Sequence, residues 1–464
     1  MPATAAMAPL DRRVDQVGLR LKYVITGRGG MKYRKTSACV NHRPQRRKFI
    51  VSSLAMGLVM TVSLPSTLAD KGVFAEYEDK EGVLKPRSQA RALTLFLCGD
   101  VMTGRGIDQI LPHPGNPILY ERYMKSAFGY VALAEEANGS IPKPVEYAYI
   151  WGDALAELEC RRPDVRIINL ETAVTRSDEV EREKAVNYRM HPDNIASITA
   201  AKIDCCALAN NHVLDWGYAG LAETLDTIKK AGIKATGAGP NIREARAPAI
   251  LPVPQKGRVI VFSFGSETSG IPWNWAASAN RPGVNLLPNF SEQTIQAIGD
   301  AVGQVKRAND IVVISIHWGG NWGYEVPTGH QVFAHRLIDE AGVDIIHGHS
   351  SHHVMGIEVY RQKLILYGCG DFLNDYEGIS GHESYRGDLA LMYFVDVDPR
   401  TGRLVDLYMI PMHIRRFRLN RASGDDASWL KDILNREGKK FGTQVELEAD
   451  NTLVLRWSGQ DGGG

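Results

Sequence analysis

Cysteine is scarce in this sequence, and its spacing forms no recognised metal-binding or disulfide pattern. The 464 residues include six cysteines, and no two of them form a CxxC pair. The sequence therefore indicates neither a disulfide-stapled scaffold nor a thiolate zinc site. Cys98, Cys205 and Cys206 lie in apolar, strand-like runs, so we expect them to be buried as small hydrophobic residues.

Several common catalytic signatures are also absent. The glycine-containing stretch Gly99–Arg105 has neither the Walker A spacing nor the GxGxxG spacing of dinucleotide-binding proteins. No GxSxG motif stands between an expected strand and an expected helix, and no zincin-type HExxH motif occurs. These absences argue against P-loop, dinucleotide, serine-hydrolase and zincin chemistry.

An excess of positive charge is missing from the main part of the chain. The whole sequence holds 54 Lys or Arg and 53 Asp or Glu, but residues 1–69 alone hold 12 and 2 of these. The remaining residues, 70–464, therefore carry 42 basic and 51 acidic side chains, a net charge of about −9. A general nucleic-acid binder would show the opposite sign, so we expect no nucleic-acid partner.

The N-terminal residues 1–69 are predicted to be a leader that exports the protein. Arg46 and Arg47 precede an apolar run, residues 49–64, which ends near Pro65 and small residues. This order resembles the twin-arginine translocation signal and predicts a periplasmic or cell-surface location. Cleavage and retention of residues 49–64 as a membrane anchor both remain open. Met31 begins a signal-like sequence of its own, so residues 1–30 need not belong to the natural product.

The rest of the chain has the length and composition of an α/β globular protein. Residues 70–90 are charged and aperiodic, as in a linker, and residues 91–415 are expected to form the main domain. Its first half alternates expected strands and helices, which favours parallel strands covered by helices. Residues 416–464 are expected to form a helix and short strands packed on the same domain.

The stretch CALANNHVLDWG, residues 206–217, is the point around which we expect the site to be organised. A short apolar strand ends here in two amides, an imidazole and a carboxylate, and a helix follows. In α/β proteins such loops at strand ends carry the chemistry. In the alternative interpretation, Asn210 and Asp215 cap the helix and His212 only packs.

Other strand ends carry metal-ligand side chains as well. Parallel strands would bring these ends to one edge of a sheet, so that residues remote in sequence meet. Carboxylate, amide and imidazole together suit one or two ions of Mn²⁺, Fe or Zn²⁺. The candidate ligands are Asp100, Glu171, Asn211, His317, His349 and His352.

Six motifs resemble those of the bacterial capsule-synthesis CapA family, which is associated with poly-γ-glutamate. They occur in family order over most of the chain after the leader: GDVMTGR at 99–105, NLETAVT at 169–175, NNHVLDWG at 210–217, HWG at 317–319, GHSSHH at 348–353 and YGCGDFLND at 367–375. The family is itself similar to calcineurin-like metallophosphoesterases. The resemblance therefore implies a four-layer αββα sandwich with a two-metal centre at one sheet edge.

The resemblance also implies roles for individual residues. Asp100 and His352 would hold one ion, Glu171 would bridge, and Asn211, His317 and His349 would hold the other. His212 would be the catalytic acid beside the leaving group, oriented by Asp215. Apart from the resemblance, an anionic substrate would need a cationic partner, for which Arg105 is the candidate, and Asn210, Trp318 and Asn321 are further candidates for substrate binding.

The sequence also departs from the family pattern near these motifs, and Ser350 and Ser351 replace a proline-containing pair after His349. Met102 stands where true phosphoesterases have a ligand histidine, so one ion would be held by fewer groups. Asn321 stands where family members often have Glu, and Asp371 replaces the Asn of a GNF motif. A phosphate substrate does not follow from the resemblance alone.

Three functions remain open at this stage. The first is an exported metal-dependent hydrolase acting on an anionic polymer or ester. The second is a non-catalytic component of a polymer synthesis and export machine, with membrane proteins of capsule synthesis as partners and a structural or vestigial metal site. The third, a glycan-binding module, rests only on tryptophans such as Trp273 and Trp322.

Overall fold

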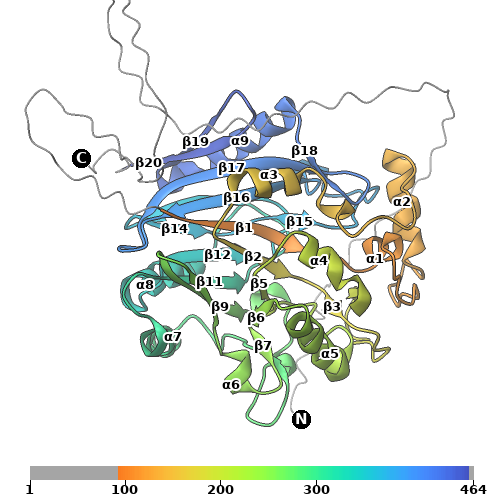
Figure 1. Ribbon diagram of the computed structural model, residues 1–464, viewed down its shortest axis with the longest axis horizontal. Helices are drawn as coiled ribbons and strands as arrows, with labels where there is room; N and C mark the ends of the chain where they lie inside the picture. The colour runs from red at the N-terminus through yellow and green to blue at the C-terminus, as the bar shows by residue number, and fades with distance from the viewer. Residues whose placement is uncertain (1–91, 459–464) are drawn as a thin grey trace, which may run out of the picture. The chain divides into compact units, whose positions relative to one another are not determined.

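The computed structural model describes residues 92–458 of the chain (Figure 1). The predicted leader and linker, with the twin arginine and the apolar run 49–64, lie outside these residues. Among the helices of the described part, none is long and apolar enough to cross a membrane.

The larger sheet has ten strands and combines parallel and antiparallel pairing. Its centre is the parallel set β1, β2, β5 and β6, and β16, β17, β20 and β19 extend it from β1 as antiparallel neighbours. β15 pairs with the end of β1, and β18 with the end of β17. Its strands are β1 (Leu93–Val101), β2 (Val165–Leu170), β5 (Cys205–Ala207), β6 (Lys234–Thr236), β15 (Asp371–Leu373), β16 (Leu389–Val397), β17 (Leu404–Ile414), β18 (Leu419–Arg421), β19 (Thr443–Leu447) and β20 (Leu453–Trp457).

The second sheet has six strands in the order β13, β14, β12, β11, β9, β8. β9, β11, β12 and β14 run parallel, and the two edge strands are antiparallel to their neighbours. The strands are β8 (Ala249–Val253), β9 (Gly257–Gly265), β11 (Asp310–His317), β12 (Ile345–His349), β13 (Ile357–Tyr360) and β14 (Lys363–Leu366). Short strand pairs β3 (Ala173–Val174) with β4 (Arg189–Met190), and β7 (Ala238–Gly239) with β10 (Gly283–Val284), lie outside both sheets.

Alternating side chains of β1 explain how the two sheets pack. Leu95 and Leu97 enter a core shared with Val261 and Val313 of the second sheet, so this core lies between the sheets. Phe96 and Cys98 point the opposite way into a different core. Because successive strand residues face opposite sides, one apolar strand serves two layers.

Helices cover the outer faces of both sheets. α3, α4 and α5 contribute to the core on the outer side of β1, whereas α7 and α8 pack on the outer side of β11 and β12. α9 adds Leu430 and Leu434 to the core between the sheets. The helices are α1 (Gly106–Ile110), α2 (Phe128–Asn138), α3 (Ala154–Arg161), α4 (Ala196–Ala200), α5 (Gly217–Lys230), α6 (Ile242–Ala245), α7 (Glu292–Val305), α8 (Thr328–Glu340) and α9 (Gly424–Gly438). The predicted α/β class is confirmed.

Candidate metal centre

The candidate site lies where the carboxyl ends of parallel strands from both sheets meet. Asp100 is near the end of β1, and His317 and His349 are the last residues of β11 and β12. His317 and His349 are also register partners on these adjacent strands. Residues more than two hundred positions apart therefore come together at one edge, as the sequence predicted.

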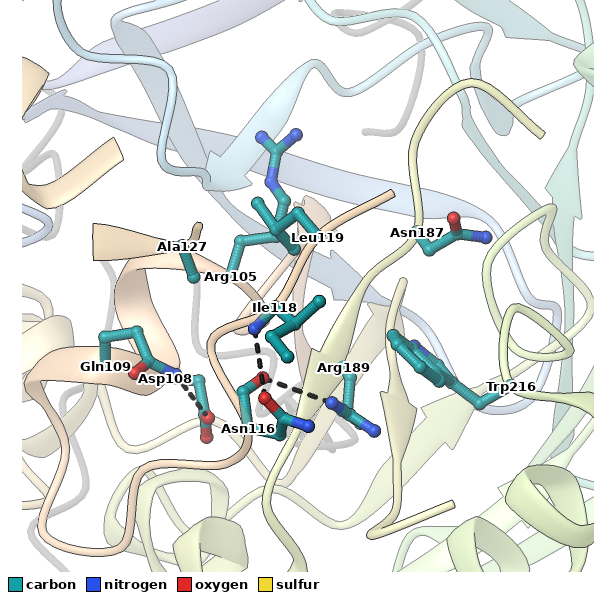
Figure 2. A pocket seen from close by; sticks show the side chains of 10 residues that line it. All are labelled: Arg105, Asp108, Gln109, Asn116, Ile118, Leu119, Ala127, Asn187, Arg189 and Trp216. Atoms are coloured by element: carbon teal, nitrogen blue, oxygen red, sulfur yellow. Dashed lines mark hydrogen bonds between the residues drawn. The ribbon is translucent and has the colours of Figure 1, made fainter. Parts of the chain in front are cut away.

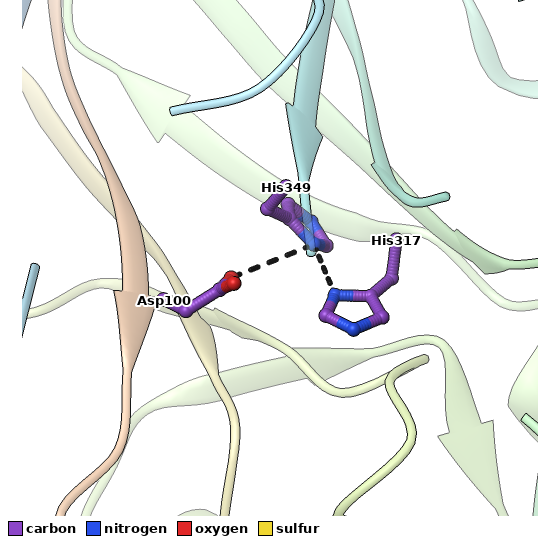
Figure 3. Close-up of side chains that lie close together, drawn as sticks. All are labelled: Asp100, His317 and His349. Atoms are coloured by element: carbon purple, nitrogen blue, oxygen red, sulfur yellow. Dashed lines mark hydrogen bonds and ion pairs between the residues drawn. The ribbon is translucent and has the colours of Figure 1, made fainter. Parts of the chain in front are cut away.

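Asp100, His317 and His349 form a compact, fully buried group (Figure 3). One potential ligand atom from each lies within 4.8 Å of the other two. Nδ1 of His349 lies 2.8 Å from Nδ1 of His317 and 3.9 Å from Oδ1 of Asp100. Atoms that share one metal ion lie only a few ångströms apart, so this spacing is compatible with a common ion.

Two more of the predicted ligands, Asn211 and Glu171, lie beside Nε2 of His317. Nε2 of His317 is 3.1 Å from Oδ1 of Asn211 and 3.7 Å from Oε1 of Glu171. Glu171 directly follows β2, and Asn211 lies in the loop after β5. The loop after β5 is thus placed against a strand end of the other sheet.

His352 contacts a carboxylate that the sequence had not assigned to the site. Nδ1 of His352 lies 2.8 Å from Oδ1 of Asp371, which is the register partner of Asp100 on β15. Burial alone would lower the pKa of His352, but the charge of Asp371 raises it above its usual range. Asp371 was noted only as a departure from the family motif, and that substitution of carboxylate for amide was the available signal.

The electrostatics of the group favour a bound cation. Burial, with the nearby Asp371 carboxylate, raises the pKa of Asp100 to about 7, and burial also raises that of Glu171. Burial lowers the pKa values of His317 and His349, so both rings are neutral at pH 7. The charges of His352 and Lys184 offset the effect of burial on Asp100 and Glu171 only in part, and a divalent ion would stabilise both carboxylates further.

A buried atom without a hydrogen bond supports the same conclusion. Oε2 of Glu171 is buried and has no hydrogen-bond partner, although buried carboxylate oxygens nearly always have one. A metal ion would satisfy this oxygen. With mixed carboxylate and imidazole donors, the residues present fit Mn²⁺, Fe or Zn²⁺.

His212 and Asp215 lie beside this group and contact each other. Nδ1 of His212 is 2.5 Å from Oδ2 of Asp215, and its Nε2 is 3.8 Å from Oε1 of Glu171. Burial lowers the pKa of His212 to about 4, so its ring is neutral at pH 7. The ring therefore presents Nε2 towards the candidate metal ligands.

Lys184 joins this pair from a loop in which the sequence showed no motif. Its Nζ is 2.5 Å from Oδ1 of Asp215 and 3.1 Å from Nδ1 of His212, and it also donates to the backbone carbonyl of Asn211. Tyr188 of the same loop donates its backbone N–H to Oδ2 of Asp215. Lys184 thus holds Asp215, which lies just before α5, from a different loop, the one that precedes β4.

Asn210 is buried beneath the site and supports its backbone. Its Nδ2 donates to Leu170 O at 2.9 Å and to Asn169 Oδ1 at 3.1 Å, and its Oδ1 accepts from the N–H of His212. Asn169 in turn donates to Oδ1 of Asp100 at 2.7 Å. These contacts favour a structural role, and substrate binding by Asn210 stays a prediction.

Arg105 is buried next to the site with its guanidinium engaged by protein groups. The guanidinium forms a two-point contact with Asp375, and Nη1 contacts Glu121 at 3.0 Å and the Tyr130 hydroxyl at 2.9 Å. Burial alone would lower the pKa of Arg105, and Asp375 raises it above its usual value. Arg105 also lines a small pocket with Arg189 and other residues, and Figure 2 shows its guanidinium pointing away from Arg189. Its proposed grip on substrate stays a prediction.

The last two predicted substrate residues occupy different environments. Trp318 is buried, donates to the carbonyl of Tyr367 at 2.9 Å and stacks on His330 at 4.5 Å. Asn321 is exposed, and its backbone carbonyl accepts from the N–H of His352. The contacts of Trp318 favour packing, whereas the side chain of Asn321 is open to a ligand.

Comparisons with known proteins agree with the resemblance seen in the sequence. A probable polyglutamine synthesis accessory protein of Mycobacterium tuberculosis (strain ATCC 25618 / H37Rv) is 51% identical over 366 residues, covering 78% of this chain and 96% of the relative. The PGA biosynthesis protein CapA of Bacillus subtilis (strain 168) is 28% identical over 286 residues, covering 61% and 63%. The capsule biosynthesis protein CapA of Bacillus anthracis is 25% identical over 285 residues, covering 61% and 60%.

A family profile covers the same part of the chain. The profile described as bacterial capsule synthesis protein PGA_cap matches residues 94–376. This range begins in β1 and ends just after β15, so it includes every predicted metal ligand and the pair His212 and Asp215. The chain belongs to the bacterial capsule synthesis protein family.

Proposed function

We propose that this chain is an exported, metal-dependent hydrolase that serves the synthesis of a capsule or polyglutamate-type polymer. The observation that carries the proposal is the buried group of Asp100, His317 and His349 at the shared edge of the two sheets. Its relatives support the biological setting, because they are named for polyglutamine synthesis, PGA biosynthesis and capsule biosynthesis.

The fold supports the proposal at the level of architecture. Two mixed sheets share one core, and helices pack on the outer face of each. We assign this order of layers to the αββα sandwich of the metallophosphoesterase type. In such an arrangement the strand ends of both sheets supply ligands to one site, which agrees with the positions of Asp100 and His349.

The residues present would hold one or two divalent ions. Asp100, His317 and His349 are the first candidates for one ion, and Glu171, Asn211 and His352 are the further candidates. Bound divalent metal supplies Lewis acidity and makes water a nucleophile near neutral pH. Met102 in place of a histidine agrees with a site that holds one ion more tightly than the other.

The pair His212 and Asp215 would move a proton beside this centre. A neutral His212 that donates Nδ1–H to Asp215 has a bare Nε2 facing Glu171, so it accepts a proton there and returns it to a leaving group. Lys184 holds Asp215 from the other side and keeps the carboxylate aligned. His212 would supply the acid and base function, and Asp215 and Lys184 would orient it. None of the three serves as a metal ligand in this proposal.

The substrate that the proposal favours is an anionic polymer or ester. The chain after residue 69 is acidic, so an anionic substrate would be repelled unless bound cations neutralise the site. The ammonium of Lys184, next to the cluster, adds a positive charge at the same place. A metal centre and this lysine together make binding of carboxylate or phosphate groups favourable.

Metal analysis combined with a substrate panel tests this function. The purified protein should contain Mn, Fe or Zn and should hydrolyse a γ-glutamyl amide, a phosphodiester or another ester in the panel only when metal is present. Asp100→Asn and His317→Ala should reduce both the bound metal and turnover. Bound metal without hydrolysis of any panel member would favour the non-catalytic role instead.

His212→Ala separates the proton-transfer role from metal binding. Loss of a general acid or base typically reduces turnover by about 10²–10⁴-fold, and we expect that loss with nearly unchanged metal content. Asp215→Asn should reduce turnover less, because it only disturbs the orientation and tautomer of the imidazole. Glu171→Ala, as the control, should release metal as well as activity. Full turnover in His212→Ala would refute the proposed role of His212.

A further inference from the structure

A series of hydrogen-bonded side chains runs behind His349, away from the metal ligands. Nε2 of His349 is 2.8 Å from the hydroxyl of Ser315, and this hydroxyl is 3.3 Å from Nδ1 of His347. Nε2 of His347 is 2.7 Å from the carbonyl oxygen of Cys98 on the other sheet. All of these residues are buried, and the proposed function gives no role to Ser315 or His347.

The last acceptor of the series, the carbonyl of Cys98, fixes the direction of every hydrogen bond before it. A carbonyl oxygen only accepts, so Nε2 of His347 must carry a hydrogen and donate it to Cys98. In a neutral ring protonated on Nε2, Nδ1 is an acceptor, and the Ser315 hydroxyl donates to it. The oxygen of Ser315 is then left to accept, and it accepts from Nε2–H of His349.

A neutral His347 is required for this direction. The ring is fully buried, and its two hydrogen-bond partners are a hydroxyl and a backbone carbonyl, neither of which carries charge. Burial without an ionic partner favours the neutral form of an imidazole. A charged His347 would reverse the direction of donation along the series and place a hydrogen on Nδ1 of His349. That hydrogen would prevent Nδ1 from binding a metal ion.

We propose that Ser315 and His347 are positioning residues that fix His349 as the Nε2–H tautomer and leave its Nδ1 bare as the metal-ligating atom. Nδ1 of His349 faces Asp100 and lies 2.8 Å from Nδ1 of His317, whose Nε2 lies 3.1 Å from the acceptor Oδ1 of Asn211. With Nε2–H of His317 donated to Asn211, both Nδ1 atoms are bare and face each other, an arrangement that a metal ion bound by both would stabilise. The inference rests on the proposed metal centre and adds residues that prepare one of its ligands. Ser315 hydrogen-bonds directly to the candidate ligand, and replacing such a partner typically changes metal affinity by about 10–100-fold, whereas His347 acts through Ser315.

Metal titration of the full chain with Mn²⁺ and with Zn²⁺ tests the inference without an activity assay. Ser315→Ala should weaken metal binding by about 10–100-fold, and His347→Leu, which acts through Ser315, should weaken it less. His347→Asn should retain more affinity than His347→Leu, because the amide oxygen of Asn can accept from Ser315 in place of Nδ1. Ser315→Ala keeps the test valid even if His347→Leu does not fold.

Ser263→Ala is the matched control. Ser263 lies on β9 directly opposite Ser315 in the register and is equally buried, but its hydroxyl accepts from the backbone N–H of Ala209. This variant loses one buried serine hydroxyl without touching His349. We expect its metal affinity to equal that of the wild type.

The tautomer of His349 gives a second readout that a purely structural role would not change. Long-range ¹H–¹⁵N spectra of the Zn²⁺-bound protein should show His349 protonated on Nε2 in the wild type and in Ser263→Ala, with faster solvent exchange of this Nε2–H in Ser315→Ala, which lacks its acceptor. His349 protonated on Nδ1 in the wild type would overturn the inference. Wild-type metal affinity in Ser315→Ala would overturn this inference and leave the proposed metal centre standing. A wild-type protein that binds neither Mn²⁺ nor Zn²⁺ would overturn both.

Discussion

Arg105 and Asp375 form a charged pair in the interior beside the candidate site. Both side chains are buried, and Asp375 also accepts the backbone N–H of Gly106 at 2.9 Å. The ring of Tyr130 lies 3.8 Å from the guanidinium carbon on one side. With its donors used by protein acceptors, the guanidinium holds together the start of α1 and the segment after β15.

Asp375→Ala should therefore destabilise the protein strongly. Removing one partner of a buried ion pair leaves the other charge unpaired and costs about 3–5 kcal/mol of unfolding free energy. Asp388→Ala is the control, because Asp388 pairs with Arg386 at the half-exposed surface, where a pair contributes about 0–1 kcal/mol. Urea unfolding followed by circular dichroism measures both. Equal losses in the two variants would contradict the interior role of Arg105.

Asp108 predicts a dependence of stability on pH that does not involve the metal ligands. Its carboxylate accepts from the backbone N–H of Gly115 at 2.7 Å and of His191 at 2.8 Å, yet burial raises its pKa from 3.8 to about 6. The folded state therefore binds more protons than the unfolded state between about pH 4 and 6. This contribution to stability is present below about pH 4 and is lost as the pH rises through about 6.

Asp108→Asn removes this titration and provides the comparison. Between about pH 3 and 7 the wild type should lose about 3 kcal/mol of unfolding free energy relative to Asp108→Asn, since a difference of about two pKa units corresponds to about that energy. Denaturant unfolding at a series of pH values gives the difference. If the wild type and Asp108→Asn differed in unfolding free energy by the same amount at pH 4 and pH 7, Asp108 would not titrate in this range.

Residue chemistry at strand ends was the part of the site that the sequence could predict. Asp100, His317 and His349 each end an apolar run, and strand polarity places such ends together. Lys184 could not be predicted, because it reaches Asp215 from a loop whose conformation depends on contacts with distant residues. The partners of His347 are equally non-local, since Cys98 belongs to the other sheet.

At the scale of elements, the strand and helix pattern was predicted well where apolar periodicity was strong. The apolar runs 248–253 and 258–264 predict a hairpin, which forms as β8 and β9, and the periodicity of residues 217–231 predicts a helix, which forms as α5. Residues 120–136 also predict a helix from the sequence, and this prediction is wrong in its first turns, because α2 begins only at Phe128. Ile118 and Ser126 instead form a bridge that closes a loop, and tertiary contacts outweigh the local apolar pattern there.

α9 offers a test of how its first turn is stabilised. Ser423 and Asp426 form a reciprocal capping box, in which each side chain contacts the backbone N–H of the other. Ser423→Ala should lower the unfolding free energy by about 1 kcal/mol. Ser291→Ala at the start of α7 should cost less, because the Ser291 hydroxyl contacts Thr294 only at 3.5 Å, at N and at Oγ1. Thermal unfolding compares the two, and a larger loss in Ser291→Ala would contradict this ranking.

At the scale of the whole molecule, the site depends on both sheets at once. Glu171 and Asn211 follow strands of the larger sheet, whereas His317 and His349 end strands of the smaller one. The α/β class follows from alternating strands and helices, but how the two sheets face each other follows from packing of the shared core. Strand polarity predicted that these ends would meet at the edge of one sheet, whereas they come from two sheets.

Export is the remaining whole-molecule prediction, and it concerns residues outside 92–458. We propose that Arg46 and Arg47, placed before the apolar run 49–64, direct a folded and metal-loaded protein across the membrane. Replacing both arginines with lysine keeps the positive charge but removes the twin-arginine pair, so the protein should accumulate inside the cell. Replacing Arg12 and Arg13 with lysine, as the control, should leave export unchanged because these residues precede Met31. Cell fractionation with immunoblotting measures the distribution, and normal export of the Arg46 and Arg47 variant would show that this pair is not the export signal.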